Sequence, residues 1–194
     1  MSTPAPATRP DNVVKPHAIR DLGPVDTTIL LEAAARFTER FWERENQRKE
    51  NAYAVFHHTD HVVLRFVRDP DDLRTWYDLP AWAILGPRVT PALMELVEPY
   101  GLARPQLSKA MFARIAPHAV IDRHIDAARG NSVSHKIHIP LVTTAGALFQ
   151  IGDDRFHLAA GRAYEVNNIR PHGAVNHADT ARLHFIFEVF DEPA

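Results

Sequence analysis

The second half of the chain consists of short β-rich runs separated by turn residues, and this pattern constrains the fold more than any other feature. The runs cover residues 109–115, 119–123, 135–142, 147–151, 155–158, 162–166 and 183–190. Short strands at such even spacing favour a barrel or a two-sheet jelly roll. With 194 residues, 45% of them hydrophobic, the chain is long enough for one such domain and short for two.

The first half has the pattern of helices that support a sheet. Apolar residues recur at helical spacing over residues 26–47, which predicts an amphipathic helix. A second helix is predicted to begin at Thr90, because Pro91 then takes the first helical position. Residues 53–56 and 61–66 are expected to form short strands. Helices followed by strands indicate an α+β fold, mainly β, in which N-terminal helices brace a jelly-roll core.

Composition excludes several classes of function. The 22 basic and 24 acidic residues give a net charge of -2, so the broad cationic field that nucleic-acid binding needs is missing. Cysteine is absent, which excludes disulfides, thiolate metal sites and cysteine nucleophiles, and leaves His, Asp and Glu as metal ligands. No apolar run approaches the roughly 18 residues of a membrane span, and the first residues lack the apolar core of a signal peptide. We therefore expect a cytoplasmic protein without a membrane span and without a nucleic-acid partner.

Residues 1–16 differ in composition from the rest of the chain. They contain four prolines among small polar residues, too little apolar surface to offset the entropy lost on ordering. We predict a disordered N-terminal tail over residues 1–16 and a single domain over residues 17–194. Within that domain, residues 17–107 are expected to give helical and strand support, and residues 108–191 the β core.

Candidate metal ligands lie at the ends of the predicted strands. His124 and Asp126 stand two residues apart at the end of one strand, where alternation places both side chains on one side. His172 follows 46 residues after Asp126 and just after Pro171. Two histidines and one carboxylate form the facial triad of non-haem Fe(II) oxygenases. An isolated H-x-D pair is more often a surface turn with an exposed ion pair, so the motif alone does not establish a metal site.

Arg182 strengthens the interpretation as a metal site with an anionic cosubstrate. It lies ten residues after His172 on the last predicted strand, among apolar neighbours, where an arginine is costly unless it meets an anion. Its planar guanidinium suits a carboxylate. The charges of Fe(II), Asp126, Arg182 and a dianionic oxoacid such as 2-oxoglutarate sum to zero, and a neutral site is easier to bury. The alternative is that Arg182 pairs with a structural carboxylate, Glu188 or Asp179.

Four motifs together carry a resemblance to a known family. They are His124-Ile125-Asp126, His138-Ile139-Pro140-Leu141, Pro171-His172-Gly173, and Arg182 at its spacing from the second histidine. Over residues 109–189 the chain thereby resembles the aspartyl/asparaginyl β-hydroxylase family. The resemblance implies a double-stranded β-helix, cupin-like core and a dioxygenase that uses Fe(II), 2-oxoglutarate and O2. It also implies that His124 and His172 bind iron. Arg182 would bind the distal carboxylate of 2-oxoglutarate, and His138 would assist at this cosubstrate.

Two positions distinguish the chain within that resemblance. Some members of the family lack the carboxylate ligand, whereas Asp126 stands two residues after His124 here, as in the proline 3-hydroxylase-like members. We therefore expect Asp126 to be a ligand. The family often has arginine two residues before the equivalent of His138, where this chain has Lys136. A lysine ammonium cannot reproduce the bidentate recognition that arginine provides.

Most of the other polar and aromatic residues are assigned to the surface or to the core. His57, His58 and His61 are interpreted as a solvated strand edge or loop, with a substrate-facing role as the alternative. Five further histidines are expected at the surface or as hydrogen-bonded core residues: His118, His135, His157, His177 and His184. Four aromatic residues are expected to pack in the core in preference to lining a substrate pocket: Phe56, Trp76, Tyr77 and Trp82. The loop after the H-x-D motif contains three candidate substrate contacts: Arg129, Asn131 and Ser134.

The sequence as a whole predicts a hydroxylase that depends on Fe(II) and 2-oxoglutarate and releases succinate and CO2. Its expected substrate is an amino acid or an amino-acyl or peptidyl group, oxidised at an unactivated C–H bond. Two alternatives stay open: a mononuclear-metal cupin enzyme that does not use 2-oxoglutarate, and a non-catalytic ligand-binding cupin. Succinate formation separates the expected function from the first alternative, and metal binding without turnover would support the second.

Overall fold

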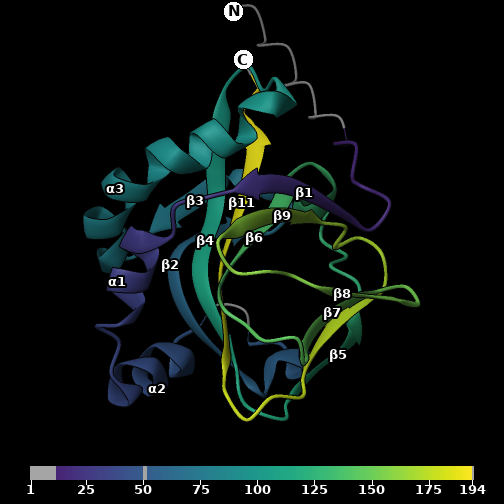
Figure 1. Ribbon diagram of the computed structural model, residues 1–194. Helices are drawn as coiled ribbons and strands as arrows, with labels where there is room; N and C mark the ends of the chain where they lie inside the picture. The colour runs from purple at the N-terminus through teal and green to yellow at the C-terminus, as the bar shows by residue number, and fades with distance from the viewer. Residues whose placement is uncertain (1–11, 50–51, 194) are drawn as a thin grey trace, which may run out of the picture.

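The computed structural model describes residues 12–49 and 52–193, and it contains two antiparallel β-sheets that face each other (Figure 1). The larger sheet has seven strands in the order β1-β9-β6-β11-β4-β2-β3, and the smaller has four in the order β5-β10-β7-β8. The strands are β1 (Ile19–Pro24), β2 (Thr59–Asp69), β3 (Asp72–Asp78), β4 (Pro105–Ile115), β5 (Val120–His124), β6 (His135–Val142), β7 (Ala147–Ile151), β8 (Asp154–His157), β9 (Arg162–Val166), β10 (His172–Asn176) and β11 (Arg182–Asp191). The prediction of a mainly β jelly-roll fold is confirmed.

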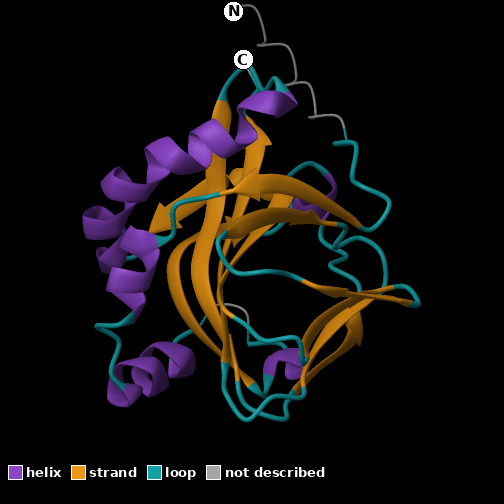
Figure 2. Ribbon diagram, viewed as in Figure 1, coloured by secondary structure: helices purple, strands orange, loops and turns teal. Residues whose placement is uncertain are grey.

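Helices cover the outer face of the larger sheet, and the smaller sheet lies against its inner face (Figure 2). The three α-helices are α1 (Thr28–Ala34), α2 (Glu39–Gln47) and α3 (Pro80–Val97). Three short 3-10 helices are η1 (Ala54–Phe56), η2 (Glu98–Tyr100) and η3 (Arg129–Ser132). Among the helices of the described ranges, none combines the length and apolar character that a membrane crossing requires.

Alternation along β11 determines which side chains enter the space between the sheets. Phe185 and Phe187 are fully buried in the core beneath the helices. Residues of opposite parity point to the inner side, where Arg182, Ile186 and Glu188 line a cavity. Because Phe185 and Phe187 pack into the core on one face of β11, the side chains of Arg182 and Glu188 on the other face are held inside the protein.

The helix predicted over residues 26–47 is divided into α1 and α2. Thr38 is the N-cap of α2: its side-chain oxygen accepts a hydrogen bond from the backbone N–H of Phe41 at 3.2 Å. Threonine is a favoured N-cap residue, and this capping interaction stabilises a second helix start within one apolar pattern.

The second helix begins ten residues earlier than predicted, and α3 continues through Pro87 and Pro91. Each proline removes one helical hydrogen bond, which normally ends or kinks a helix. Six buried residues along α3 offset this cost: Trp82, Leu85, Gly86, Val89, Leu93 and Val97.

Several strand predictions need correction. Residues 53–56 contain η1 instead of a strand, and the strand expected at residues 61–66 is the longer β2. The sequence patterns did not indicate β1, β3 or β10. Because β1, β2 and β3 belong to the larger sheet, the expected boundary at residue 107 does not separate a support region from the β core.

The segment before β1 is attached to the core. Lys15 donates hydrogen bonds from Nζ to the backbone oxygen of Ser134 at 2.6 Å and to Oδ1 of Asn168 at 2.8 Å. The backbone N–H of Val13 also donates to the Ser132 oxygen, at 3.0 Å. The structure thus places residues 12–16 of the predicted tail against the core, and residues 1–11 lie outside the described ranges.

Candidate active site

A histidine from each of two neighbouring strands meets Asp126 at one end of the smaller sheet. His124 ends β5, His172 begins β10, and the two residues are paired in register. Gly173 allows the strands to approach, since a Cβ atom there would lie 2.7 Å from the carbonyl oxygen of Ile121. One ligand atom from each of His124, Asp126 and His172 lies within 4.8 Å of the others. The spacing of the H-x-D motif and the distant histidine thus yields one compact N, O, N donor set.

Backbone carbonyls fix the tautomer of both histidines. Nδ1 of His124 donates to the backbone oxygen of Asp122 at 2.8 Å, and Nδ1 of His172 donates to that of Arg170 at 3.0 Å. A carbonyl can only accept, so each Nδ1 carries the hydrogen and each Nε2 keeps its lone pair. Burial lowers the pKa of His172 to about 4, which keeps its ring neutral near pH 7. Both Nε2 atoms are therefore prepared to bind a cation.

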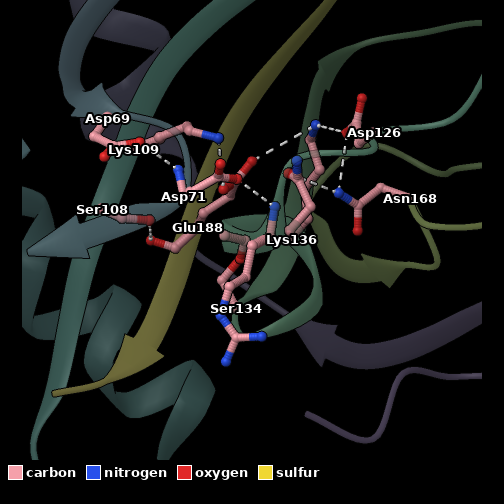
Figure 3. Close-up of polar contacts among 12 residues, drawn as sticks. Asp69, Asp71, Ser108, Lys109, Asp126, Ser134, Lys136, Asn168 and Glu188 are labelled. Atoms are coloured by element: carbon pink, nitrogen blue, oxygen red, sulfur yellow. Dashed lines mark hydrogen bonds and ion pairs between the residues drawn. The ribbon is translucent and has the colours of Figure 1, made fainter. Parts of the chain in front are cut away.

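Two donors hold the carboxylate of Asp126. Lys136 donates from Nζ to Oδ2 at 2.7 Å, and the side-chain amide of Asn168 donates to the same oxygen at 2.9 Å (Figure 3). Burial would raise the pKa of Asp126, but the Lys136 ammonium and these hydrogen bonds lower it well below its usual value. The carboxylate is ionised, as a metal ligand must be.

Lys136 belongs to a row of charged side chains on three adjacent strands. Its Nζ lies 3.6 Å from Oε1 of Glu188, and Oε2 of Glu188 lies 3.0 Å from Nζ of Lys109. Burial would lower the pKa of Lys136, but the carboxylates of Asp126 and Glu188 raise it above its usual value. The lysine that replaces the family's frequent arginine is thus a fixed cation that orients Asp126.

Arg182 lines the same cavity, of about 560 Å³, as the His124, Asp126 and His172 group. It is 3% exposed, and no ion pair or hydrogen bond of its guanidinium occurs within residues 12–49 and 52–193. Burial lowers its pKa to about 9. The structural carboxylates suggested as partners are engaged elsewhere, Glu188 with Lys109 and Asp179 with His118 at 2.9 Å. The alternative of a structural ion pair for Arg182 is therefore wrong.

Two of the four other predicted contacts line the cavity. His138 and Asn131 line it, and both are buried. Neither Arg129 nor Ser134 is among the lining residues that the structure describes. The backbone N–H of Arg129 donates to Asp71 at 2.7 Å, and the hydroxyl of Ser134 donates to the Gly130 oxygen at 2.8 Å.

Three residues that the sequence analysis assigned to the surface or the core lie in or beside the site. His61 is buried in the cavity wall, so its assignment to a solvated edge is wrong, whereas His57 and His58 are exposed. Phe56 lines the cavity instead of the core, and its ring lies edge-on 5.4 Å from that of His124. His184 is a buried core histidine whose Nδ1 lies 3.3 Å from Nδ1 of His138, while its Nε2 has no partner among the described residues.

The sequence analysis did not single out Thr59, Lys109 or Met111, which also line the cavity. All three lie on the inward-facing side of β2 or β4. Strand alternation would have shown that they share a face, but not that this face looks toward the metal ligands, because that depends on the packing of two sheets.

Acidification is expected to destabilise the metal-free protein. Burial lowers the pKa of His61 to about 3 and the pKa values of His138 and His184 well below their usual range. In the unfolded chain these histidines bind protons below about pH 6.5. The unfolded state then holds more protons, so the free energy of unfolding falls by up to about 1.4 kcal/mol per histidine and pH unit as pH drops from 6.5 toward 4. Chemical denaturation at several pH values measures this, and a flat profile would contradict the burial of neutral histidines.

Comparisons with known proteins find a matching family model and solved structures of similar fold. The sequence model of the family described as aspartyl/asparaginyl beta-hydroxylase matches residues 86–192. No curated protein matches the chain. Similar solved structures include an oxidoreductase of the 2OG-Fe(II) oxygenase family from Burkholderia pseudomallei, with a TM-score of 0.57 and 14% identity over 78% of this chain and 77% of that one.

Two further structures extend the similarity of fold. The viral collagen prolyl hydroxylase of Paramecium bursaria Chlorella virus-1, solved as a 2OG complex, has a TM-score of 0.59 and 6% identity over 90% of this chain and 96% of that one. The nickel complex of the non-heme monooxygenase ThoJ has a TM-score of 0.54 and 15% identity over 91% and 76% of the two chains. At these identities the structures show a shared fold.

Proposed function

Because this chain belongs to the aspartyl/asparaginyl β-hydroxylase family, we propose that it is an Fe(II)- and 2-oxoglutarate-dependent dioxygenase whose iron is bound by His124, Asp126 and His172. The donor set supports this assignment, since two neutral imidazoles and one carboxylate are the ligands of the Fe(II) facial triad. All three residues line the cavity, where small ligands could reach a metal that they hold.

The observation that carries the proposal is the unpaired Arg182 in the cavity of the triad. A buried arginine without an anion is costly, and the carboxylate of a bound ligand would neutralise it. The two carboxylates of 2-oxoglutarate would also offset part of the positive charge that Arg182, Lys136 and Lys109 bring to the cavity wall. A cupin without an anionic ligand gives no reason for this buried cation.

Each polar residue has a distinct part in the proposed reaction. Bound iron and 2-oxoglutarate supply the oxidising chemistry, in which O2 gives one oxygen atom to succinate and one to the substrate C–H bond, with release of CO2. His124 and His172 direct their Nε2 lone pairs to the ion. Lys136 and Asn168 hold the carboxylate of Asp126 in place. The apolar wall around them excludes water and restricts how a substrate can lie.

The proposed substrate is an amino acid or an amino-acyl or peptidyl group. The cavity extends to the ion pair of Lys109 and Glu188, which offers both a cation and an anion to a substrate, beside the aromatic ring of Phe66. His138 is proposed to contact the cosubstrate, and Asn131 the substrate. Arg129 and Ser134 remain predicted substrate contacts, although neither lies on the described cavity wall.

Ordered binding tests the proposed function. Anaerobic calorimetry is expected to show one Fe(II) per chain, followed by one 2-oxoglutarate that binds tightly only to the metal-loaded protein. Metal binding without any affinity for 2-oxoglutarate would contradict the proposal and favour a different cupin function.

Replacing Asn168 by alanine is expected to weaken metal binding about 10- to 100-fold, because partners that orient a metal ligand typically contribute this much. The variant loses the hydrogen bond to Asp126 but leaves the three ligands intact. Asn167→Ala is the matched control, since its amide donates to the Pro16 oxygen at 2.8 Å and has no contact with Asp126. Titration with Mn(II) measures both, and equal affinities in the two variants would show that Asn168 does not orient the ligand.

A further inference from the structure

Unpartnered polar atoms collect on the wall of the cavity. Four residues lining it carry a buried side-chain polar atom that has neither a hydrogen-bond nor an ion-pair partner in the described residues. These residues are Thr59, His61, His138 and Arg182. Buried polar groups are normally paired, and leaving one unpaired is unfavourable. A polar ligand in the cavity would supply the missing partners.

Thr59 lies beside Arg182 across one strand. Thr59 on β2 and Arg182 on β11 are both paired in register with Ile115 on β4. Residues directly opposite one another on neighbouring strands share a face of the sheet. Two inter-strand spacings place the Cα atoms of Thr59 and Arg182 roughly 10 Å apart, and both residues line the same cavity.

The hydroxyl of Thr59 has no partner among the described residues. The residue is 1% exposed, and its backbone oxygen accepts a hydrogen bond from Nζ of Lys49 at 2.9 Å, which fixes the strand at this point. If Thr59 served packing alone, a valine would fill the same volume without burying an unpaired hydroxyl.

We propose that Thr59 is a cosubstrate-binding residue, whose hydroxyl donates a hydrogen bond to the ligand carboxylate that Arg182 holds. This inference rests on the proposed function, because it takes that ligand to be 2-oxoglutarate. A carboxylate offers about four lone-pair positions, more than one guanidinium occupies, so it can accept from both side chains. Thr59 lies on β2, outside residues 86–192, the part that the family model matches, so under this proposal a strand from the first half of the chain contributes to ligand recognition.

The test is the affinity of the Mn(II)-loaded protein for 2-oxoglutarate, measured by anaerobic calorimetry. Thr59→Val, which removes only the hydroxyl, is expected to raise the dissociation constant about 10-fold, equivalent to about 1.4 kcal/mol. Thr59→Ser should bind nearly as the wild type does, because it keeps the donor. Thr90→Val on α3, outside the cavity, is the matched control and should change nothing. Thr59→Ala replaces the valine variant if that protein does not fold.

A second ligand distinguishes the loss of one hydrogen bond in Thr59→Val from a general change in the cavity. 2-Oxopentanoate keeps the oxoacid end but has a methyl group in place of the distal carboxylate, so Thr59→Val should leave its dissociation constant unchanged. Equal affinity of wild type and Thr59→Val for 2-oxoglutarate would overturn the inference and leave the proposed function standing. An equal loss for both ligands would also overturn it. A metal-loaded wild type that does not bind 2-oxoglutarate would overturn both.

Discussion

Arg182→Ala is expected to raise the dissociation constant of 2-oxoglutarate about 30-fold or more while metal binding survives. The ligand carboxylate would lose its buried cationic partner, at a cost of about 2 to 5 kcal/mol, and each 1.4 kcal/mol corresponds to a factor of ten. Arg182→Lys should recover only part of the lost affinity, because the compact lysine ammonium cannot form the paired hydrogen bonds of the planar guanidinium. Calorimetry with Mn(II) and then 2-oxoglutarate measures both constants.

The stability of the free protein gives the control for this variant. Arg182 is buried without an ion-pair partner in the described residues, and burial lowers its pKa to about 9. Removing an uncompensated buried cation should leave the melting temperature unchanged or raise it. A destabilised protein with unchanged affinity for 2-oxoglutarate would mean that Arg182 has a structural role, and the main support for an oxygenase would be lost.

His172→Ala is expected to abolish turnover, because two protein ligands rarely hold Fe(II) firmly. The loss of metal affinity should exceed the roughly 10- to 100-fold expected for partners such as Asn168, which act only through a ligand. Asp126→Ala should also cause a large loss, with some residual activity, since some relatives function without a carboxylate ligand. Metal titration and succinate release measure the two effects separately.

An exposed histidine provides the matched control for the ligand variants. His177 lies outside the cavity wall that the structure describes, so His177→Ala should retain metal affinity and turnover. Full activity in His172→Ala, or wild-type metal affinity in Asp126→Gly, would remove the corresponding residue from the ligand set.

The fold was largely predictable where short β-rich runs follow one another at even spacing. The runs after residue 107 have this spacing, and the jelly roll follows from it. β1 was missed because it pairs only with β9 at the edge of the sheet, and its glycine and proline obscure the strand pattern. α3 was placed too late because Pro91 marks a helix start in isolation, whereas burial of Trp82 and Leu85 extends the helix to Pro80.

The candidate site could be predicted where its residues are close in sequence or where a buried charge would be unfavourable without a partner. The pair His124 and Asp126 is local, and Arg182 stands out because a cation in an apolar strand needs a partner. Thr59 and His61 could not be assigned from the sequence, since they reach the cavity only because β2 pairs with β4. The same holds for Lys136, whose role depends on the position of Asp126.

Succinate formation by the wild-type protein tests the central claim most directly. The assay contains Fe(II), ascorbate, oxygen and 2-oxoglutarate, with a panel of amino acids, dipeptides and acylated amino acids as substrates. The account predicts that one class of these compounds stimulates succinate release, and that release requires Fe(II) and is lost in His172→Ala. Oxidation of a substrate without succinate would contradict it, as would a protein that binds Fe(II) and 2-oxoglutarate tightly yet forms no succinate with any of them.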